Sequence, residues 1–168
     1  QVLLISILII GTVRSQDSKF AIPDYDLIKT EIMDSSSIYF YPRLMNRMIA
    51  CDTTLNLEEY RHLYFGYIFK KDYEPYWNSD DEDNLLKYYY SKRLKTKDYP
   101  KIIKLATHSI LEFPFDLRQM NFLSFTYQEM GNEDMARKIG IRYNGIMAAI
   151  FSSGDGKTLK SAFHVISV

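Results

Sequence analysis

The sequence predicts a mainly α fold of antiparallel helix pairs, followed by a short β element at the C-terminal end. Three observations support this prediction. Apolar residues recur at intervals of three and four along much of the chain, as on the buried face of a helix. Capping residues and short breaks separate these stretches, so that neighbouring helices are expected to run antiparallel. Residues 162–168 are instead mostly β-branched or aromatic, as in a strand.

The first half of the chain contains several helix-forming stretches. We expect short helices over residues 24–33 and 44–51. Asn56, with Glu59 three residues later, has the spacing of a capping box and precedes a helix with a tyrosine-rich apolar stripe. Four consecutive acids at residues 80–83 come before a leucine pair. Acidic side chains are favoured in the first turn of a helix by its dipole, so a helix is predicted to begin there.

The second half predicts three consecutive helices. Their expected N-caps are Asp98, Asp116 and Asn132, while Pro114 and Gly131 end the first two. The residues expected on the buried faces are Ile102, Leu105, Ala106, Ser109, Ile110, Phe113, Met120, Leu123, Tyr127, Met130, Met135, Ala136, Ile139, Tyr143, Ile146, Met147 and Ile150.

These three helices have the lengths and breaks of helix-turn-helix repeats. The positions that fall on the repeat pattern are Met120, Leu123, Ser124, Tyr127 and Ala136, with Pro114 on the closing proline of the preceding repeat. Gly140 and Ala148 depart from it. Over residues 83–151 the sequence therefore resembles tetratricopeptide repeats, and a generic helical bundle is the alternative.

The end of the chain has a different composition. Residues 152–158 contain two glycines and predict a loop, and residues 162–168 predict a strand. A strand needs a hydrogen-bonding partner. We expect that partner to be either the aromatic segment at residues 38–41 or chain that continues beyond residue 168.

The first residues predict export from the cell. Residues 2–13 are apolar and uncharged, too short to span a bilayer but typical of the core of a secretory signal. Cleavage after Ser15 would remove residues 1–15 and leave residues 16–168 as a single helical domain with no stable membrane span. In an oxidising compartment Cys51 would be a lone thiol, which we interpret as a buried structural residue.

The charge balance and the motifs of the sequence do not favour nucleic-acid binding, nucleotide binding or a di-metal site. The 21 basic and 21 acidic residues balance, which provides no overall attraction for nucleic acid. Gly156-Lys157-Thr158 lacks the earlier glycine and the strand-to-helix setting of a phosphate-binding loop. Glu59 and His62 share a helix face, but a second Glu-x-x-His motif of a di-metal site does not follow. We predict no catalytic residues, no metal ligands and no cofactor.

Aromatic residues are the remaining candidates for function, since they make up 15% of the chain. Tyrosine is amphipathic and loses little conformational entropy on contact, so that clusters of it suit recognition of peptides or sugars. Three successive tyrosines at residues 88–90 cannot all face inward on one helix, and at least one should be exposed. The residues proposed for binding are Tyr64, Tyr67, Trp77, Tyr88 and Tyr90.

Five short sequence segments, in a fixed order along the chain, are more specific to one protein family than these motifs are. They are residues 41–43 (YPR), 59–67 (EYRHLYFGY), 73–76 (YEPY), 153–157 (SGDGK) and 162–168 (AFHVISV). In this order the chain resembles a secreted bacterial family, the domain of unknown function 4919. The resemblance implies an exported protein of the periplasm or cell envelope of Gram-negative bacteria. It provides no functional residues.

The expected function is therefore an exported protein-interaction or scaffold module of the bacterial envelope, with a protein or peptide as its partner. Two alternatives are an envelope hydrolase that uses His62 with Glu59, and a glycan-binding protein that uses exposed aromatic side chains such as Trp77.

Overall fold

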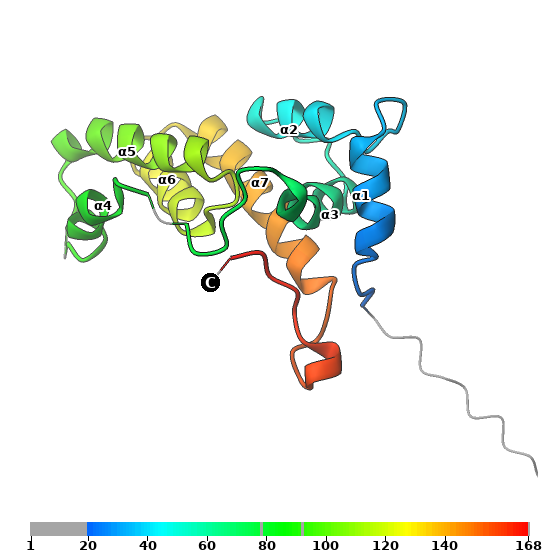
Figure 1. Ribbon diagram of the computed structural model, residues 1–168. Helices are drawn as coiled ribbons and strands as arrows, with labels where there is room; N and C mark the ends of the chain where they lie inside the picture. The colour runs from blue at the N-terminus through cyan, green and yellow to red at the C-terminus, as the bar shows by residue number, and fades with distance from the viewer. Residues whose placement is uncertain (1–19, 78, 92, 168) are drawn as a thin grey trace, which may run out of the picture.

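The longest helix, α7 (Glu133–Phe151), lies between two groups of helices and packs against both (Figure 1). The helices of one group are α1 (Tyr25–Met33), α2 (Tyr41–Ile49) and α3 (Leu57–Gly66). Those of the other group are α4 (Glu82–Tyr89), α5 (Tyr99–Glu112) and α6 (Leu117–Glu129). Helix α3 provides the main contact of the first group with α7, and α6 provides that of the second.

The computed structural model describes residues 20–77, 79–91 and 93–167, and the export signal predicted over residues 1–15 lies outside them. Short 3-10 turns complete the described elements: η1 (Tyr67–Phe69), η2 (Thr96–Asp98) and η3 (Leu159–Ser161). Across these described ranges the regular structure is helical and contains no strand, which confirms the mainly α class.

Local capping determines where most helices begin. The side chains of Asp24, Asn56, Asp116 and Asn132 each accept a hydrogen bond from a backbone N–H in the first turn of the helix that follows. The capping box predicted at Asn56 is confirmed, because the Glu59 carboxylate also accepts from the Asn56 N–H at 2.8 Å. The cap predicted at Asp98 is wrong: its side chain makes no capping bond, and α5 begins with a proline in its first turn.

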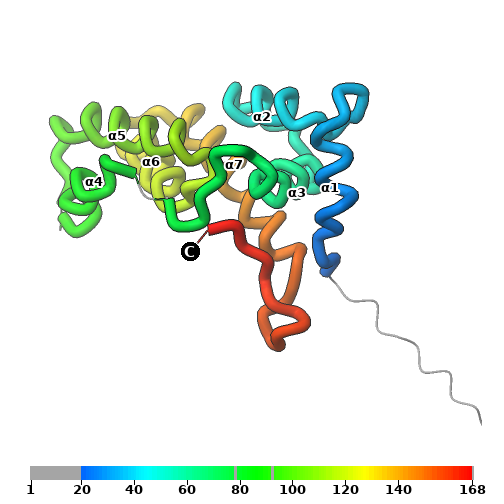
Figure 2. Tube along the Cα trace, viewed as in Figure 1, coloured from blue at the N-terminus to red at the C-terminus, as the bar shows by residue number. Residues whose placement is uncertain are grey.

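Helices α5, α6 and α7 follow one another with short turns and pack in sequence, as the trace in Figure 2 shows. The predicted inward faces are largely confirmed by complete burial of the residues at their centres, which are Ile102, Ala106, Ser109, Met120 and Ile146. The prediction is wrong for Met130, which is 48% exposed at the end of α6. Small side chains also let α6 and α7 approach closely. The partly buried Ser124 donates a hydrogen bond from its hydroxyl to the Ala136 carbonyl across this contact at 2.9 Å.

The contact between α3 and α7 depends on a glycine. The ring of Tyr60 on α3 lies directly over Gly145 on α7, in the space that a Cβ atom would occupy. Tyr60 itself is buried. The absence of a side chain at residue 145 therefore lets the two groups of helices join through an aromatic side chain.

The predicted C-terminal β element is wrong, because residues 162–167 contain no strand. The segment lies against helices, and side chains supply its hydrogen bonds. The Tyr64 hydroxyl accepts from the Ile166 N–H at 3.3 Å, and the Tyr73 hydroxyl donates to the Ile166 carbonyl at 2.6 Å. The His164 N–H donates to the Ser153 hydroxyl at 2.9 Å. The proposed partner at residues 38–41 instead leads into α2, which begins at Tyr41.

Substitution Gly145→Ala tests the junction of the two groups of helices. The added methyl group would overlap the Tyr60 ring, so we expect a loss of about 2 kcal/mol in the free energy of unfolding, the usual scale of overpacking. Denaturant unfolding followed by circular dichroism measures this loss.

Gly140→Ala on the same helix is the matched control. Its Cβ would meet only the Ser124 hydroxyl, at 3.7 Å, so the higher helix propensity of alanine should stabilise the protein by about 0.5–1 kcal/mol. Equal effects of the two substitutions would contradict the proposed role of Gly145.

Candidate functional site

An aromatic groove lies between the end of α4, the turn that leads to α5, and one side of α6. It encloses about 690 Å³. The residues that line this aromatic groove are Tyr88, Tyr89, Ser91, Arg93, Leu94, Thr96, Tyr99, Asn121, Phe122, Phe125 and Glu129. One of the tyrosines proposed for binding from the sequence, Tyr88, lines it.

The floor of the aromatic groove is fixed by packing. The Tyr89 ring lies 4.5 Å from that of Phe122 between ring centres, and its hydroxyl donates to the Arg118 carbonyl at 2.8 Å. Burial raises the pKa of Tyr89 to about 12. Phe125 by contrast is 46% exposed, and the Lys87 ammonium lies over the Tyr88 ring at 5.2 Å. The groove thus combines a rigid floor with accessible aromatic walls.

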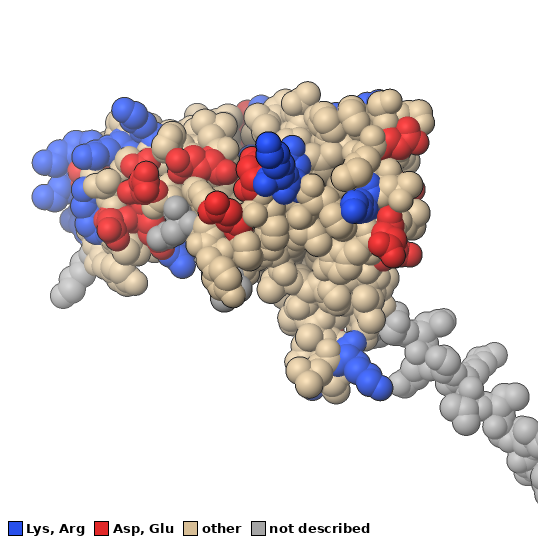
Figure 3. Space-filling model, viewed as in Figure 1, with Lys and Arg blue, Asp and Glu red and all other residues tan. Residues whose placement is uncertain are grey.

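Basic side chains gather on one side of this end of the molecule. Residues 87–104 contain seven lysines and arginines but a single acid, Asp98. Figure 3 shows Lys and Arg side chains gathered where α5 begins, although the whole chain has no net charge. The aromatic groove therefore opens beside a locally positive surface.

The five aromatic residues proposed for binding from the sequence differ in how far their side chains are exposed. Tyr64 and Tyr67 are only 3% and 8% exposed, so we remove them from the contact residues. Tyr64 holds the C-terminal segment through its hydroxyl, and Tyr67 packs against Tyr73, Phe113 and Phe115. Their places on the apolar stripe of α3 and the following turn explain this burial.

The other three remain accessible to different degrees. Tyr90 is 82% exposed, which confirms that the run at residues 88–90 presents at least one ring to solvent. Tyr88 lines the aromatic groove. Trp77 is partly buried, lies 5.5 Å from the Phe113 ring, and lines a separate pocket of about 240 Å³ with Ser79 and Arg118.

The residues considered for catalysis have other partners. The Glu59 carboxylate binds Arg47 and the Asn56 N–H. His62 is buried, with Nδ1 2.7 Å from the Glu58 carbonyl oxygen and Nε2 2.7 Å from a carboxylate oxygen of Glu31. Both ring nitrogens are thus engaged, and the fold does not pair His62 with Glu59.

The glycine-rich turn at residues 154–158 does not form a phosphate cradle. The N–H groups of Asp155 and Gly156 both donate to the Ser161 carbonyl at 2.8 Å. The Lys157 N–H donates to the Asp155 carboxylate at 3.0 Å. Because these backbone donors serve the turn itself, they do not point together at an anion.

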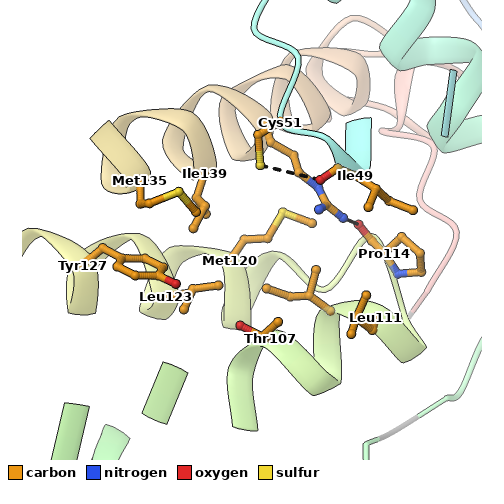
Figure 4. A pocket seen from close by; sticks show the side chains of 12 residues that line it. Ile49, Cys51, Thr107, Leu111, Pro114, Met120, Leu123, Tyr127, Met135 and Ile139 are labelled. Atoms are coloured by element: carbon orange, nitrogen blue, oxygen red, sulfur yellow. Dashed lines mark hydrogen bonds between the residues drawn. The ribbon is translucent and has the colours of Figure 1, made fainter. Parts of the chain in front are cut away.

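A second pocket, which the sequence analysis missed, lies between α5, α6 and α7. We call it the Arg142 pocket. It encloses about 210 Å³, and Figure 4 shows the apolar side chains of Met120, Leu123 and Ile139 around it. The Arg142 side chain lines it as well, although this residue is only 8% exposed.

Arg142 is only partly satisfied by hydrogen bonds. One terminal nitrogen, Nη2, donates to the Pro114 carbonyl at 2.6 Å, drawn dashed in Figure 4. Nε is buried without a partner among the described residues. Burial lowers the pKa of the guanidinium from its usual value.

The spacing of residues in the sequence could have indicated that Arg142 is buried. It follows Ile139 by three residues and precedes Ile146 by four, on the buried face of α7.

Cys51 forms one edge of the Arg142 pocket. Its φ of 56° is in the left-handed region, at the turn that follows α2. Its thiol lies 3.8 Å from the Ile49 carbonyl oxygen and remains free. Cys51 is partly exposed, so the interpretation of this residue as fully buried is wrong.

Residues 26–168 match the family described as Domain of unknown function (DUF4919). The chain belongs to this family. No curated protein and no solved structure matches it. Among the described residues of this DUF4919 chain, no helix is both long enough and apolar enough to cross a membrane. The described residues also contain no group of three or more His, Cys, Asp and Glu side chains that could hold a metal ion.

Buried and partly buried tyrosines should make the fold of this chain sensitive to alkali. Burial raises the pKa of Tyr60, Tyr64 and Tyr89 from 10.0 to about 12 in each case. Above pH 10 the unfolded chain loses these protons first, so the folded state binds more protons. The free energy of unfolding should therefore be at its full value below pH 10 and fall between pH 10 and 12. Denaturant unfolding across this pH range, with tyrosinate absorbance as a second signal, measures this fall. A free energy of unfolding that stays constant between pH 10 and 12 would contradict the prediction.

Proposed function

We propose that this chain is a protein-interaction module that binds an acidic peptide segment of a partner protein in the aromatic groove. The observation that carries the proposal is an aromatic-lined groove beside a locally basic surface. Aromatic walls supply contact area at low conformational-entropy cost, and nearby positive charge favours an acidic partner.

The proposed contact residues follow from their accessibility. Phe125 and Tyr88 would hold an aromatic or aliphatic side chain of the peptide against the rigid floor formed by Tyr89 and Phe122. Arg93 lines the groove, is exposed, and would face a carboxylate of the peptide. Tyr90 is close in sequence and would extend this surface.

A repeat-like architecture supports this role. In this proposal α4, α5, α6 and α7 pack as tetratricopeptide-like pairs, in agreement with the pattern over residues 83–151 and with the successive contacts of these helices. Helical repeats bind partners through extended surfaces between their elements. We further propose that the module acts after export, in the periplasm or cell envelope, because residues 2–13 have the composition of a secretory signal.

Selection from a random peptide library tests the proposal. We expect the selected peptides to carry an aromatic or aliphatic residue flanked by Asp and Glu. Phe125→Ala and Arg93→Glu should each weaken binding about tenfold in fluorescence anisotropy, and Arg93→Glu should also reduce the dependence of binding on salt.

Two exposed residues outside the groove provide controls. Tyr76→Ala removes a ring that is 81% exposed, and Lys160→Glu reverses a charge on η3. Both variants should bind as the original chain does. Selection of peptides without acids, or equal binding by all four variants, would refute the proposal.

Glycan binding is the second candidate, favoured by the pocket beside Trp77. Its wall combines this indole with the polar side chains of Ser79, Glu82 and Arg118, the pairing of aromatic face and hydrogen-bonding groups that suits a sugar. A carbohydrate array should then show a signal that Trp77→Ala abolishes, and an array without signal would exclude this candidate. We do not propose a hydrolase, because both ring nitrogens of His62 are engaged within the protein.

A further inference from the structure

Arg142 carries a buried positive charge that no carboxylate of the described residues neutralises. Four other arginines form ion pairs, namely Arg47, Arg61, Arg118 and Arg137. The hydrogen bond that Arg142 makes is to a neutral carbonyl, that of Pro114. A charge taken out of water is costly unless it is paired, so an unpaired guanidinium at this depth needs an explanation.

The surroundings of the guanidinium indicate what could pair with it. Met120, Leu123 and Ile139 supply apolar walls, and the partly exposed Met135 and the exposed Leu111 stand at the open side. A volume of about 210 Å³ limits the occupant to a small molecule or the end of a longer one.

We propose that the Arg142 pocket binds a monocarboxylate with a short apolar body, the carboxylate paired with Arg142 and the body among Met120, Leu123 and Ile139. A carboxylate forms charge-assisted hydrogen bonds with a guanidinium and would supply the missing negative charge. A single negative charge matches the single cation of the pocket, whereas a dianion such as phosphate would bring an unpaired charge into an apolar space. The proposal is independent of the aromatic groove.

Two sources supply this chemistry, a free aliphatic acid and the C-terminal residue of a peptide. Hexanoate represents the first and N-acetylleucine the second. Hexanol and hexylammonium have the same chain as hexanoate with a neutral or a positive head group, and N-acetylleucinamide lacks the carboxylate of N-acetylleucine. This series separates the need for negative charge from simple burial of an apolar chain.

Titrations observed by NMR of ¹³C-methyl methionine would locate and measure binding. We expect a carboxylate to shift the methyl signals of Met120 and Met135, which line the pocket, and to leave that of the exposed Met33 on α1 unchanged. The carboxylates should bind at least about tenfold more tightly than their neutral and positive counterparts. Whichever of hexanoate and N-acetylleucine binds more tightly identifies the source of the carboxylate.

Arg142→Gln removes the charge and keeps N–H donors for the Pro114 carbonyl. This variant should lose at least about tenfold in affinity for the carboxylate and keep its weak affinity for hexanol. Arg137→Gln is the matched control on the same helix, because Arg137 is exposed and pairs with Asp134, and it should bind as the original chain does.

Several results would overturn the proposal. These are the absence of methyl shifts with both carboxylates, equal binding of hexanoate and hexylammonium, or unchanged affinity in Arg142→Gln. If Arg142→Gln does not fold, the comparison of head groups on the original chain decides the question alone.

Discussion

The close contact between the Tyr60 ring and Gly145 determines how this molecule is assembled. Helix α7 is the shared element of the two groups of helices, and α3 reaches it through this contact. Arg142 lies one turn before Gly145 on α7, so the same helix that joins the groups also carries the buried guanidinium.

Helix α6 separates the two candidate binding regions. Phe122 and Phe125 belong to the aromatic groove, whereas Met120 and Leu123 belong to the Arg142 pocket. Adjacent residues on a helix point about 100° apart, so that one short segment can line two cavities. The two regions differ in chemistry as well, because one is open and bordered by exposed basic side chains while the other is apolar around one buried cation.

Local sequence patterns predicted much of the fold. Caps such as Asn56 and Asp116 act within a few residues, and the period of apolar residues in α5, α6 and α7 identifies the buried faces directly. The tail was mispredicted because β-branched residues indicate an extended backbone but not the groups that bind it. Its partners, Tyr64 and Tyr73, are more than ninety residues away in sequence. Tyrosine composition alone could not separate the buried Tyr64 from the exposed Tyr90, since the same side chain suits a core and a binding surface.

The way in which the C-terminal segment is held has a consequence for the behaviour of the protein in solution. An extended backbone with free N–H and C=O groups can pair with the same segment of another molecule and start aggregation. Here tyrosine hydroxyls occupy both backbone groups of Ile166, and the Ser153 hydroxyl occupies the N–H of His164. Side chains from elsewhere in the fold thus block part of an edge that would otherwise favour intermolecular β-pairing.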